Sequence, residues 1–422
     1  MSLPPPVSGG PYPGGLPDRG AASRREASRA SDRLSLSSRM MLGPSNTIRS
    51  MPRSGIREIN ELASQYDGVI HLEMGQPNFS TPEHISRAAG EAALNGFTTY
   101  TPNAGIPELR EAIAEKLRNF NGLRVGAENV TVTTGGCGAL FTSLVSLCDP
   151  GDAILLSDPT WPNYAMMASI QGLEVRHYPL RARDGWLPNP EEIERQITPN
   201  CRAMILVSPS NPTGTMVGED LMGEILDLAR RHNLWVISDE VYDAITFGEP
   251  AVSAYPFDSD RVISIFSFSK TYAMTGWRIG YTVARPDMAD VLGNSQEPTT
   301  SCVNSLAQIG ALTALRGPQD EVWAMRDAYW ERRDLVTEML SQADIAFARP
   351  DGAFYVWVDI SQSRLSDNEF ARRMVIEHRV AVVPGTTFGP GGGTHVRVSL
   401  ATDTESLLEG ISRLIRAVRS PC

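Results

Sequence analysis

The sequence predicts an α/β fold built on a mostly parallel β-sheet that helices cover on both faces. From residue 129 onward, short apolar runs rich in β-branched residues alternate with segments of helical periodicity. Parallel strands need crossover connections, and helices usually provide them. The 422 residues, 41% of them hydrophobic and 21% charged, are enough for a large core and two or three domains.

The first 44 residues differ from the rest of the chain in composition. They are rich in proline, glycine, serine and arginine and lack an apolar stripe. Such a segment cannot bury enough apolar surface to offset its ordering entropy, so residues 1–44 are predicted to be a disordered tail. Order is expected to begin with a helical stretch at 45–63 and a brief strand at 69–75 that ends in a tight turn.

Periodicity predicts the remaining elements. Helices are expected at 82–95, 106–120, 138–147, 220–231, 305–316 and 320–342. Strands of the parallel sheet are expected at 130–134, 153–157, 174–178, 203–208, 234–238, 262–266 and 277–284. The C-terminal part adds strands at 353–359, 380–383 and 394–400 and helices at 367–377 and 407–419.

Composition excludes several classes of function. A net charge of −11 argues against a general affinity for nucleic acid or anionic membranes. No apolar run reaches the roughly 18 residues of a membrane helix. The five cysteines form no CxxC pair and the six histidines show no ligand spacing, so no metal site is predicted. Reduced thiols are typical of the cytoplasm, which is the expected location.

Lysine is rare in this chain, and one lysine has an unusual setting. Of the 38 basic residues only Lys116 and Lys270 are lysines. A lysine amine that loses its proton can attack a carbonyl and form a Schiff base, whereas a guanidinium stays protonated. Lys270 follows an apolar run and precedes a Trp-Arg pair. It is therefore interpreted as a nucleophile, the alternative being a leftover surface lysine.

Two groups of residues near strand ends suit a phosphate. Gly135-Gly136-Cys137 opens a helix whose backbone N–H groups can hold an anion, although many helices follow glycine. Ser267 and Arg278 flank Lys270 and offer a hydroxyl and a guanidinium. Ligands of a parallel sheet bind at the carboxyl ends of its strands, where these groups are expected.

Other residues suit an aromatic ring that carries a nitrogen and an oxygen. Asp239 ends an apolar strand, where its charge needs a cation such as a pyridinium nitrogen, unless it caps a following helix. Tyr242 offers a phenol, and the stiff turn SPSNPTG (208–214) presents Asn211, unless it is only a turn. Trp161 is either a ring that stacks on the ligand or a core residue.

Together these groups describe a site for pyridoxal phosphate (PLP), and the chain resembles the class I aminotransferases of PLP fold type I. The strings SPSNPTG (208–214), SDEVY (238–242) and SFSKTYAMTGWRIG (267–280) carry the resemblance, which covers about 45–419 and points to the bacterial aspartate aminotransferase branch. It implies a seven-stranded type of sheet in a large domain at 81–325. It also implies a smaller α+β domain formed by 45–80 and 326–422.

The resemblance further implies a reaction and a set of roles. The enzyme would move an amino group between an α-amino acid and a 2-oxo acid, with Lys270 as internal aldimine and proton shuttle. The ring would be held by Asp239 at its nitrogen, by Tyr242 and Asn211 at its phenolic oxygen, and by Trp161 on its face. The phosphate would be held by Gly136, Cys137, Ser267 and Arg278. Arg397 would bind the substrate α-carboxylate with help from Gly75 and Asn211. Tyr100 would reach the phosphate of the neighbouring subunit of a homodimer.

Two departures from the family pattern concern substrate choice. Thermophile-type aspartate aminotransferases carry a lysine for the distal carboxylate where this chain has Cys137, and Glu297 is expected near the substrate. Both favour neutral or basic side chains over aspartate. The same residues would also serve a PLP-dependent lyase, γ-replacement enzyme, cyclase or oxidase. A PLP-sensing regulator is disfavoured because residues 1–44 are too short for a helix-turn-helix module.

Overall fold

The structure is a computed structural model that describes residues 43–51 and 54–420. It divides into two units, residues 1–50 and residues 51–422. In the first unit, α2 (Asn46–Ser50) is a short helix with exposed side chains. Most of the predicted disordered tail lies outside the described residues. All other elements belong to the second unit.

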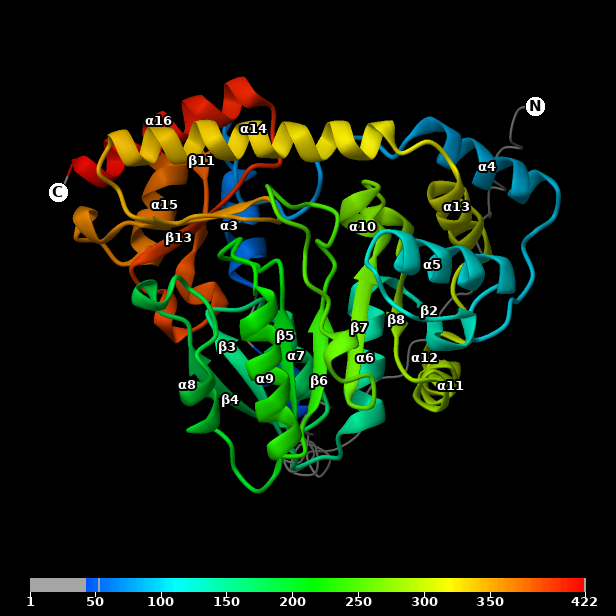
Figure 1. The fold of residues 1–422 in the computed structure, drawn as a ribbon. Helices are drawn as coiled ribbons and strands as arrows, with labels where there is room; N and C mark the ends of the chain where they lie inside the picture. The colour runs from blue at the N-terminus through cyan, green and yellow to red at the C-terminus, as the bar shows by residue number, and fades with distance from the viewer. Residues whose placement is uncertain (1–42, 52–53, 421–422) are drawn as a thin grey trace, which may run out of the picture. The chain divides into compact units, whose positions relative to one another are not determined.

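A seven-stranded sheet forms the centre of the second unit (Figure 1). Its strands, in spatial order, are β2 (Val130–Thr133), β8 (Gly280–Val283), β7 (Val262–Ser267), β6 (Trp235–Asp239), β5 (Cys201–Val207), β3 (Ala153–Asp158) and β4 (Glu174–Pro179). Strand β8 is antiparallel to both of its neighbours, and the other pairs are parallel. The predicted fold class is therefore confirmed.

Apolar residues alternate between the two faces of this sheet, and helices cover both. In β3, Ile154 and Leu156 pack into one cluster with α6 and α7 residues, whereas Leu155 packs into a second cluster with residues of α5 and α9. The helices of this part of the chain are α4 (Glu83–Leu94), α5 (Pro107–Asn119), α6 (Gly135–Leu147), α7 (Asn163–Ile170), α8 (Pro190–Glu194), α9 (Glu219–Arg231), α10 (Phe268–Thr271), α11 (Pro286–Ser295), α12 (Glu297–Thr300) and α13 (Ser305–Arg316). Burial on both faces explains why these strands are almost continuously apolar.

A smaller antiparallel sheet lies at the other end of the long helix α14 (Asp320–Gln342), which crosses the top of Figure 1. Its order is β12 (Val383–Pro384), β13 (His395–Ser399), β10 (Tyr355–Asp359) and β9 (Phe347–Ala348). A separate parallel pair joins β1 (Ile70–His71) to β11 (Val380–Ala381). Helices α3 (Gly55–Ala63), α15 (Asp367–His378) and α16 (Thr404–Arg419) pack with these strands in a third apolar cluster.

Several predicted boundaries were wrong. The stretch 45–63 is not one helix but two, α2 and α3, and the sequence places Pro52 between them, which cannot donate the hydrogen bond of a continuing helix. The strand expected at 69–75 is only the two-residue β1. The helix expected at 138–147 begins at Gly135. The strand expected at 277–284 begins at Gly280, because Arg278 has a left-handed backbone with φ of 55°.

No helix among residues 43–51 and 54–420 is long and apolar enough to cross a membrane.

Candidate active site

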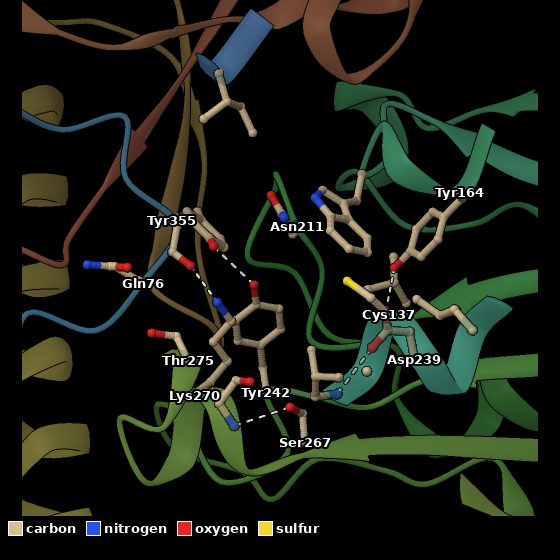
Figure 2. Close-up of a pocket in the computed structure, with 18 of the residues that line it drawn as sticks. Gln76, Cys137, Tyr164, Asn211, Asp239, Tyr242, Ser267, Lys270, Thr275 and Tyr355 are labelled. Carbon is tan, nitrogen blue, oxygen red and sulfur yellow. Dashed lines mark hydrogen bonds between the residues drawn. The ribbon is translucent and has the colours of Figure 1, made fainter. Parts of the chain in front are cut away.

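One cavity collects almost all of the residues that the sequence singled out (Figure 2). It opens at the carboxyl ends of β5, β6 and β7 and is closed by the N-terminus of α6, the segment after β1, and strands β10 and β13. The predicted residues that line it are Gly75, Gly136, Cys137, Trp161, Asn211, Asp239, Tyr242, Ser267, Lys270, Arg278 and Arg397. Residues from seven separate regions of the chain thus meet at one edge of the sheet.

Lys270 projects into this cavity from the short helix α10, directly after β7. Its Nζ atom donates a hydrogen bond to the carbonyl of Gly75. Burial of the ammonium, followed by repulsion from Arg397, lowers the pKa of Lys270 to about 8. About a tenth of this amine is therefore neutral and nucleophilic at pH 7, far more than for an ordinary lysine.

Lys116 has a different environment and cannot take the same role. Its ammonium forms an ion pair with the buried carboxylate of Asp243 and lies 5.0 Å from the centres of the Phe120 and Phe266 rings. Asn121 donates a second hydrogen bond, of 3.0 Å, to Asp243. Lys116 is thus a structural cation outside the cavity.

Asp239, the last residue of β6, is buried opposite Lys270, on the Cys137 side of the cavity (Figure 2). Its Oδ2 accepts a 2.7 Å hydrogen bond from the Tyr164 hydroxyl, and its Oδ1 accepts one of 3.3 Å from the Val241 amide. Burial raises the pKa of Asp239 to about 6. A buried carboxylate without a bonded cation is costly, so this site favours a positively charged ligand atom.

An anion site lies at the N-terminus of α6. Gly135 has φ of +70°, and a Cβ atom there would come within 2.8 Å of the Arg278 guanidinium, so only glycine fits. A Cβ atom added at Gly136 would lie 3.2 Å from a Val241 methyl group and 3.9 Å from the Ser267 Cβ. The helix dipole, the guanidinium and a serine hydroxyl therefore converge where a phosphate would fit. Burial raises the pKa of Cys137, so this thiol is neutral here.

Arg397 is a fully buried guanidinium at the opposite side of the cavity. It extends from β13, and its Nη1 donates a 3.1 Å hydrogen bond to Asn211 Oδ1. Its Nη2 donates one of 2.6 Å to the backbone carbonyl of Glu73. The ring of Tyr355 lies 4.3 Å from the guanidinium carbon. An arginine held in this way is poised to bind a carboxylate.

Two tyrosines in the cavity escaped the sequence analysis. Tyr164 donates its hydroxyl to Asp239, and the Tyr355 hydroxyl lies 3.0 Å from that of Tyr242 (Figure 2). Both are far from their partners in sequence, so no local motif marks them. Tyr355 lies in a Gly-Ala-Phe-Tyr string at the start of β10, an aromatic signal without a polar partner nearby in the chain.

Two predicted residues lie outside this cavity. Tyr100 is 89% exposed and does not line the cavity of this chain, so its expected role across a dimer interface stays a prediction. Glu297 accepts a 3.1 Å hydrogen bond from Asn103 at the start of α12 and does not line the cavity. The expected place of Glu297 near the substrate therefore stays a prediction, because α12 turns this side chain toward Asn103 and away from the cavity of its own chain.

The residues present fit PLP. The cofactor requires an amine, an anion site, an acidic partner for its ring nitrogen and a flat wall for its ring. The cavity offers Lys270, the α6 N-terminus with Arg278, the buried Asp239, and Trp161. The raised pKa of Asp239 marks a carboxylate that a bound cation would stabilise.

Comparison with known proteins places the chain in one family. Residues 67–414 match the family model for aminotransferases of class I and II. The aspartate aminotransferase of Pyrococcus horikoshii is 37% identical over 374 residues, 87% of this chain and 95% of its own. An aromatic-amino-acid aminotransferase of Thermococcus litoralis is 35% identical and covers 87% and 96%.

A solved structure gives the same result. The aspartate aminotransferase of Thermus thermophilus with maleate superimposes with a TM-score of 0.85 at 36% identity, covering 89% of this chain and all of the other. The family match extends over both sheets and includes every cavity-lining residue except Ile56. The predictions of family, cofactor and amino-group transfer are thus confirmed. This chain belongs to the class I and II aminotransferases and is a PLP-dependent enzyme that transfers an amino group between amino and oxo acids.

Proposed function

We propose that Lys270 is the residue that carries the cofactor and moves the proton of the reaction. When bound, PLP supplies an electron sink for the electron pair left at the substrate Cα. Lys270 Nζ accepts the proton that leaves this carbon, and its pKa of about 8 suits a base near neutral pH. The observation that carries this proposal is the pairing of Lys116 with Asp243, which leaves Lys270 as the free amine in the cavity.

The other cavity residues take supporting roles in this proposal. Asp239 holds a proton on the ring nitrogen, and Tyr164 fixes the Asp239 carboxylate by its 2.7 Å hydrogen bond. Tyr242 and Asn211 bond the phenolic oxygen, and Trp161 covers the ring. The phosphate is held by Gly136, Cys137, Ser267 and Arg278.

The test is a half-reaction with a lysine variant. Holoenzyme given an amino acid alone should convert to the pyridoxamine form and release one oxo acid per site. Lys270→Ala should lose this conversion and recover part of it with a small added primary amine, because the amine replaces the missing base. Lys116→Arg keeps its ion pair and serves as the matched control. Conversion by Lys270→Ala at the wild-type rate would refute the assignment.

We propose further that Arg397 binds the substrate α-carboxylate and that the enzyme prefers amino acids without an acidic side chain. The charged residues that line the cavity are Asp239, Lys270, Arg278 and Arg397, and each already has a role. The remaining walls are largely apolar and include Ile56, Met74, Leu140 and Val241. Cys137 offers no positive charge. A distal carboxylate would therefore lie against neutral groups of this chain, at a desolvation cost.

A homodimer with Tyr100 contributed across the interface is the proposed assembly. Exposed apolar side chains include Leu94 and Tyr100, each 89% exposed, and Phe97. The Phe97 carbonyl is hydrogen-bonded to Ser305, which joins this segment to the residues after α12. Large apolar side chains exposed within one short segment support a subunit interface there.

A subunit-mixing experiment tests this assembly. Tyr100→Ala and Lys270→Ala subunits should each be weakly active alone. If Tyr100 acts on the neighbouring subunit, mixed dimers contain one intact site, and about a quarter of wild-type activity should return on mixing. No recovery in verified mixed dimers would place Tyr100 in its own subunit's site or outside any site.

The predicted domain division and location are also proposals. Ile59 and Leu72 pack in one apolar cluster with residues of β10, β13 and α16. This packing supports assigning much of 45–80 to the smaller domain with 326–422, beside a large domain at 81–325.

The four cysteines among the described residues are all free thiols, which supports the cytoplasm as the location of the protein. Limited proteolysis and cell fractionation test these two assignments.

A further inference from the structure

Glu73 is a buried carboxylate beside the cavity, and none of the roles above involves its side chain. It lies between β1 and the cavity-lining Met74 and is fully buried. Its Oε1 accepts hydrogen bonds from Asn60 Nδ2 at 3.0 Å and from His71 Nδ1 at 2.8 Å. Its Oε2 is buried with no hydrogen-bond partner among the described residues. Such a group is expensive to bury, so it calls for an explanation.

The backbone of the same residue is bonded to Arg397. The Glu73 carbonyl accepts the 2.6 Å hydrogen bond from Arg397 Nη2. Two residues later, the carbonyl of Gly75 accepts the hydrogen bond from Lys270. Leu72 is fixed on the other side, since its carbonyl accepts a 2.8 Å hydrogen bond from the Ser399 amide. The segment from Leu72 to Gly75 is therefore hydrogen-bonded to two of the cationic side chains of the cavity, Arg397 and Lys270.

We propose that Glu73 is a positioning residue for Arg397. Its carboxylate, hydrogen-bonded to Asn60 of α3 and to His71 of β1, fixes the backbone carbonyl that orients the Arg397 guanidinium toward the substrate α-carboxylate. This inference rests on the proposed role of Arg397. It adds that α3 and β1, which supply Asn60 and His71, determine how well that arginine is oriented.

Charge supports the same assignment. Arg397 is buried, its Nη atoms donate hydrogen bonds to a backbone carbonyl and an amide oxygen, and its Nε has no partner among the described residues. Burial lowers the pKa of Arg397. Three neighbouring groups act against that decrease, in the order Tyr355, Tyr242 and the Glu73 carboxylate. A buried cation is stabilised by a buried anion nearby, and Glu73 is the carboxylate that acts on it.

The test compares a substrate that has an α-carboxylate with one that lacks it. Apparent dissociation constants of phenylalanine and of 2-phenylethylamine are measured from the cofactor absorbance of the holoenzyme. Glu73→Ala should weaken phenylalanine about tenfold, the effect of one lost hydrogen bond to a charged group, and change the amine less than twofold. Glu73→Gln retains an acceptor for Asn60 and should stay within about threefold of wild type. Asn60→Ala, which removes one of the two donors, should show a smaller effect of the same selectivity.

Controls separate this inference from the function on which it rests. Glu58 is an exposed glutamate on the same helix α3, and Glu58→Ala should leave both dissociation constants unchanged. Arg397→Lys should weaken phenylalanine selectively, and adding Glu73→Ala to it should weaken binding little further, because the two residues act in series. If Arg397→Lys shows no selectivity, the proposed role of Arg397 fails.

Two results would overturn the role of Glu73 alone. One is that Glu73→Ala weakens the binding of phenylalanine and of 2-phenylethylamine equally, while Arg397→Lys weakens the binding of phenylalanine alone. The other is a Glu73→Gln variant as impaired as Glu73→Ala, which would show that the hydrogen bonds do not carry the effect.

Discussion

Replacing Asp239 by asparagine should stabilise the enzyme without cofactor and abolish its activity with cofactor. Burial raises the pKa of Asp239 from 3.8 to about 6. At about 1.4 kcal/mol per pKa unit, the ionised carboxylate costs the cofactor-free fold about 3 kcal/mol near pH 7. Asparagine removes this cost and loses about 1 kcal/mol of hydrogen bonding to Tyr164 or Val241. A net gain of about 2 kcal/mol in the free energy of unfolding is expected.

The size of this stabilisation depends on pH. The pKa of Asp239 is higher in the folded state, so the wild-type protein loses stability as pH rises from about 4 to about 6 and then levels off. The advantage of Asp239→Asn should therefore grow over that interval and be small at pH 4. In the proposed site Asp239 keeps the ring nitrogen of PLP protonated, so the variant should still bind PLP but lose nearly all proton abstraction.

Urea unfolding of the cofactor-free proteins at several pH values, at one fixed protein concentration, measures this difference. Asp243→Asn is the matched control, because it removes the partner of Lys116 and should destabilise the protein at the same pH. A cofactor-free Asp239→Asn that is no more stable than wild type at pH 7, or whose advantage does not depend on pH, would refute the reasoning.

Tyr242→Phe should raise the pKa of the cofactor's absorbance change, because one donor to the phenolic oxygen is lost, and an unchanged pH titration would argue against that contact. Aspartate and glutamate should react about ten to a hundred times less efficiently than neutral amino acids of similar length, since the described residues that line the cavity leave no unassigned cation for the distal carboxylate. Single-turnover rates across acidic, neutral and basic amino acids check this, and aspartate as the fastest donor would show that another cation binds it. Removing the first 40 residues should leave turnover unchanged, and lost turnover in a folded truncated protein would contradict the tail assignment.

The sequence predicted those parts of the site whose signals are local. Lys270, Asp239 and Ser267 are found at strand ends because an apolar run followed by a polar residue is visible in a single segment. The sequence analysis missed Tyr164 and Tyr355 because their hydrogen-bond partners lie 75 and 113 residues away in the chain. It missed Glu73 because this residue is bonded to Asn60 of α3 and Arg397 of β13, and neither belongs to its own segment. Hydrophobic periodicity says which face of an element is buried, but not which distant side chain meets it.

The boundaries show the same limit. The start of α6 was placed three residues late because glycines were interpreted as a break before the helix, whereas the left-handed Gly135 opens it. Glu297 was expected near the substrate from its position in the sequence, which could not show that α12 brings it to Asn103. Local propensity predicted the type of each element well, and tertiary contacts decided its ends.

Borohydride reduction of the holoenzyme followed by peptide mapping tests the central claim most directly. Reduction fixes the cofactor covalently to the lysine that carries it. The account predicts label on Lys270 alone, because the Lys116 ammonium is bound to Asp243 between two aromatic rings outside the cavity. Label on Lys116, or on neither lysine in an enzyme that still contains PLP, would contradict it.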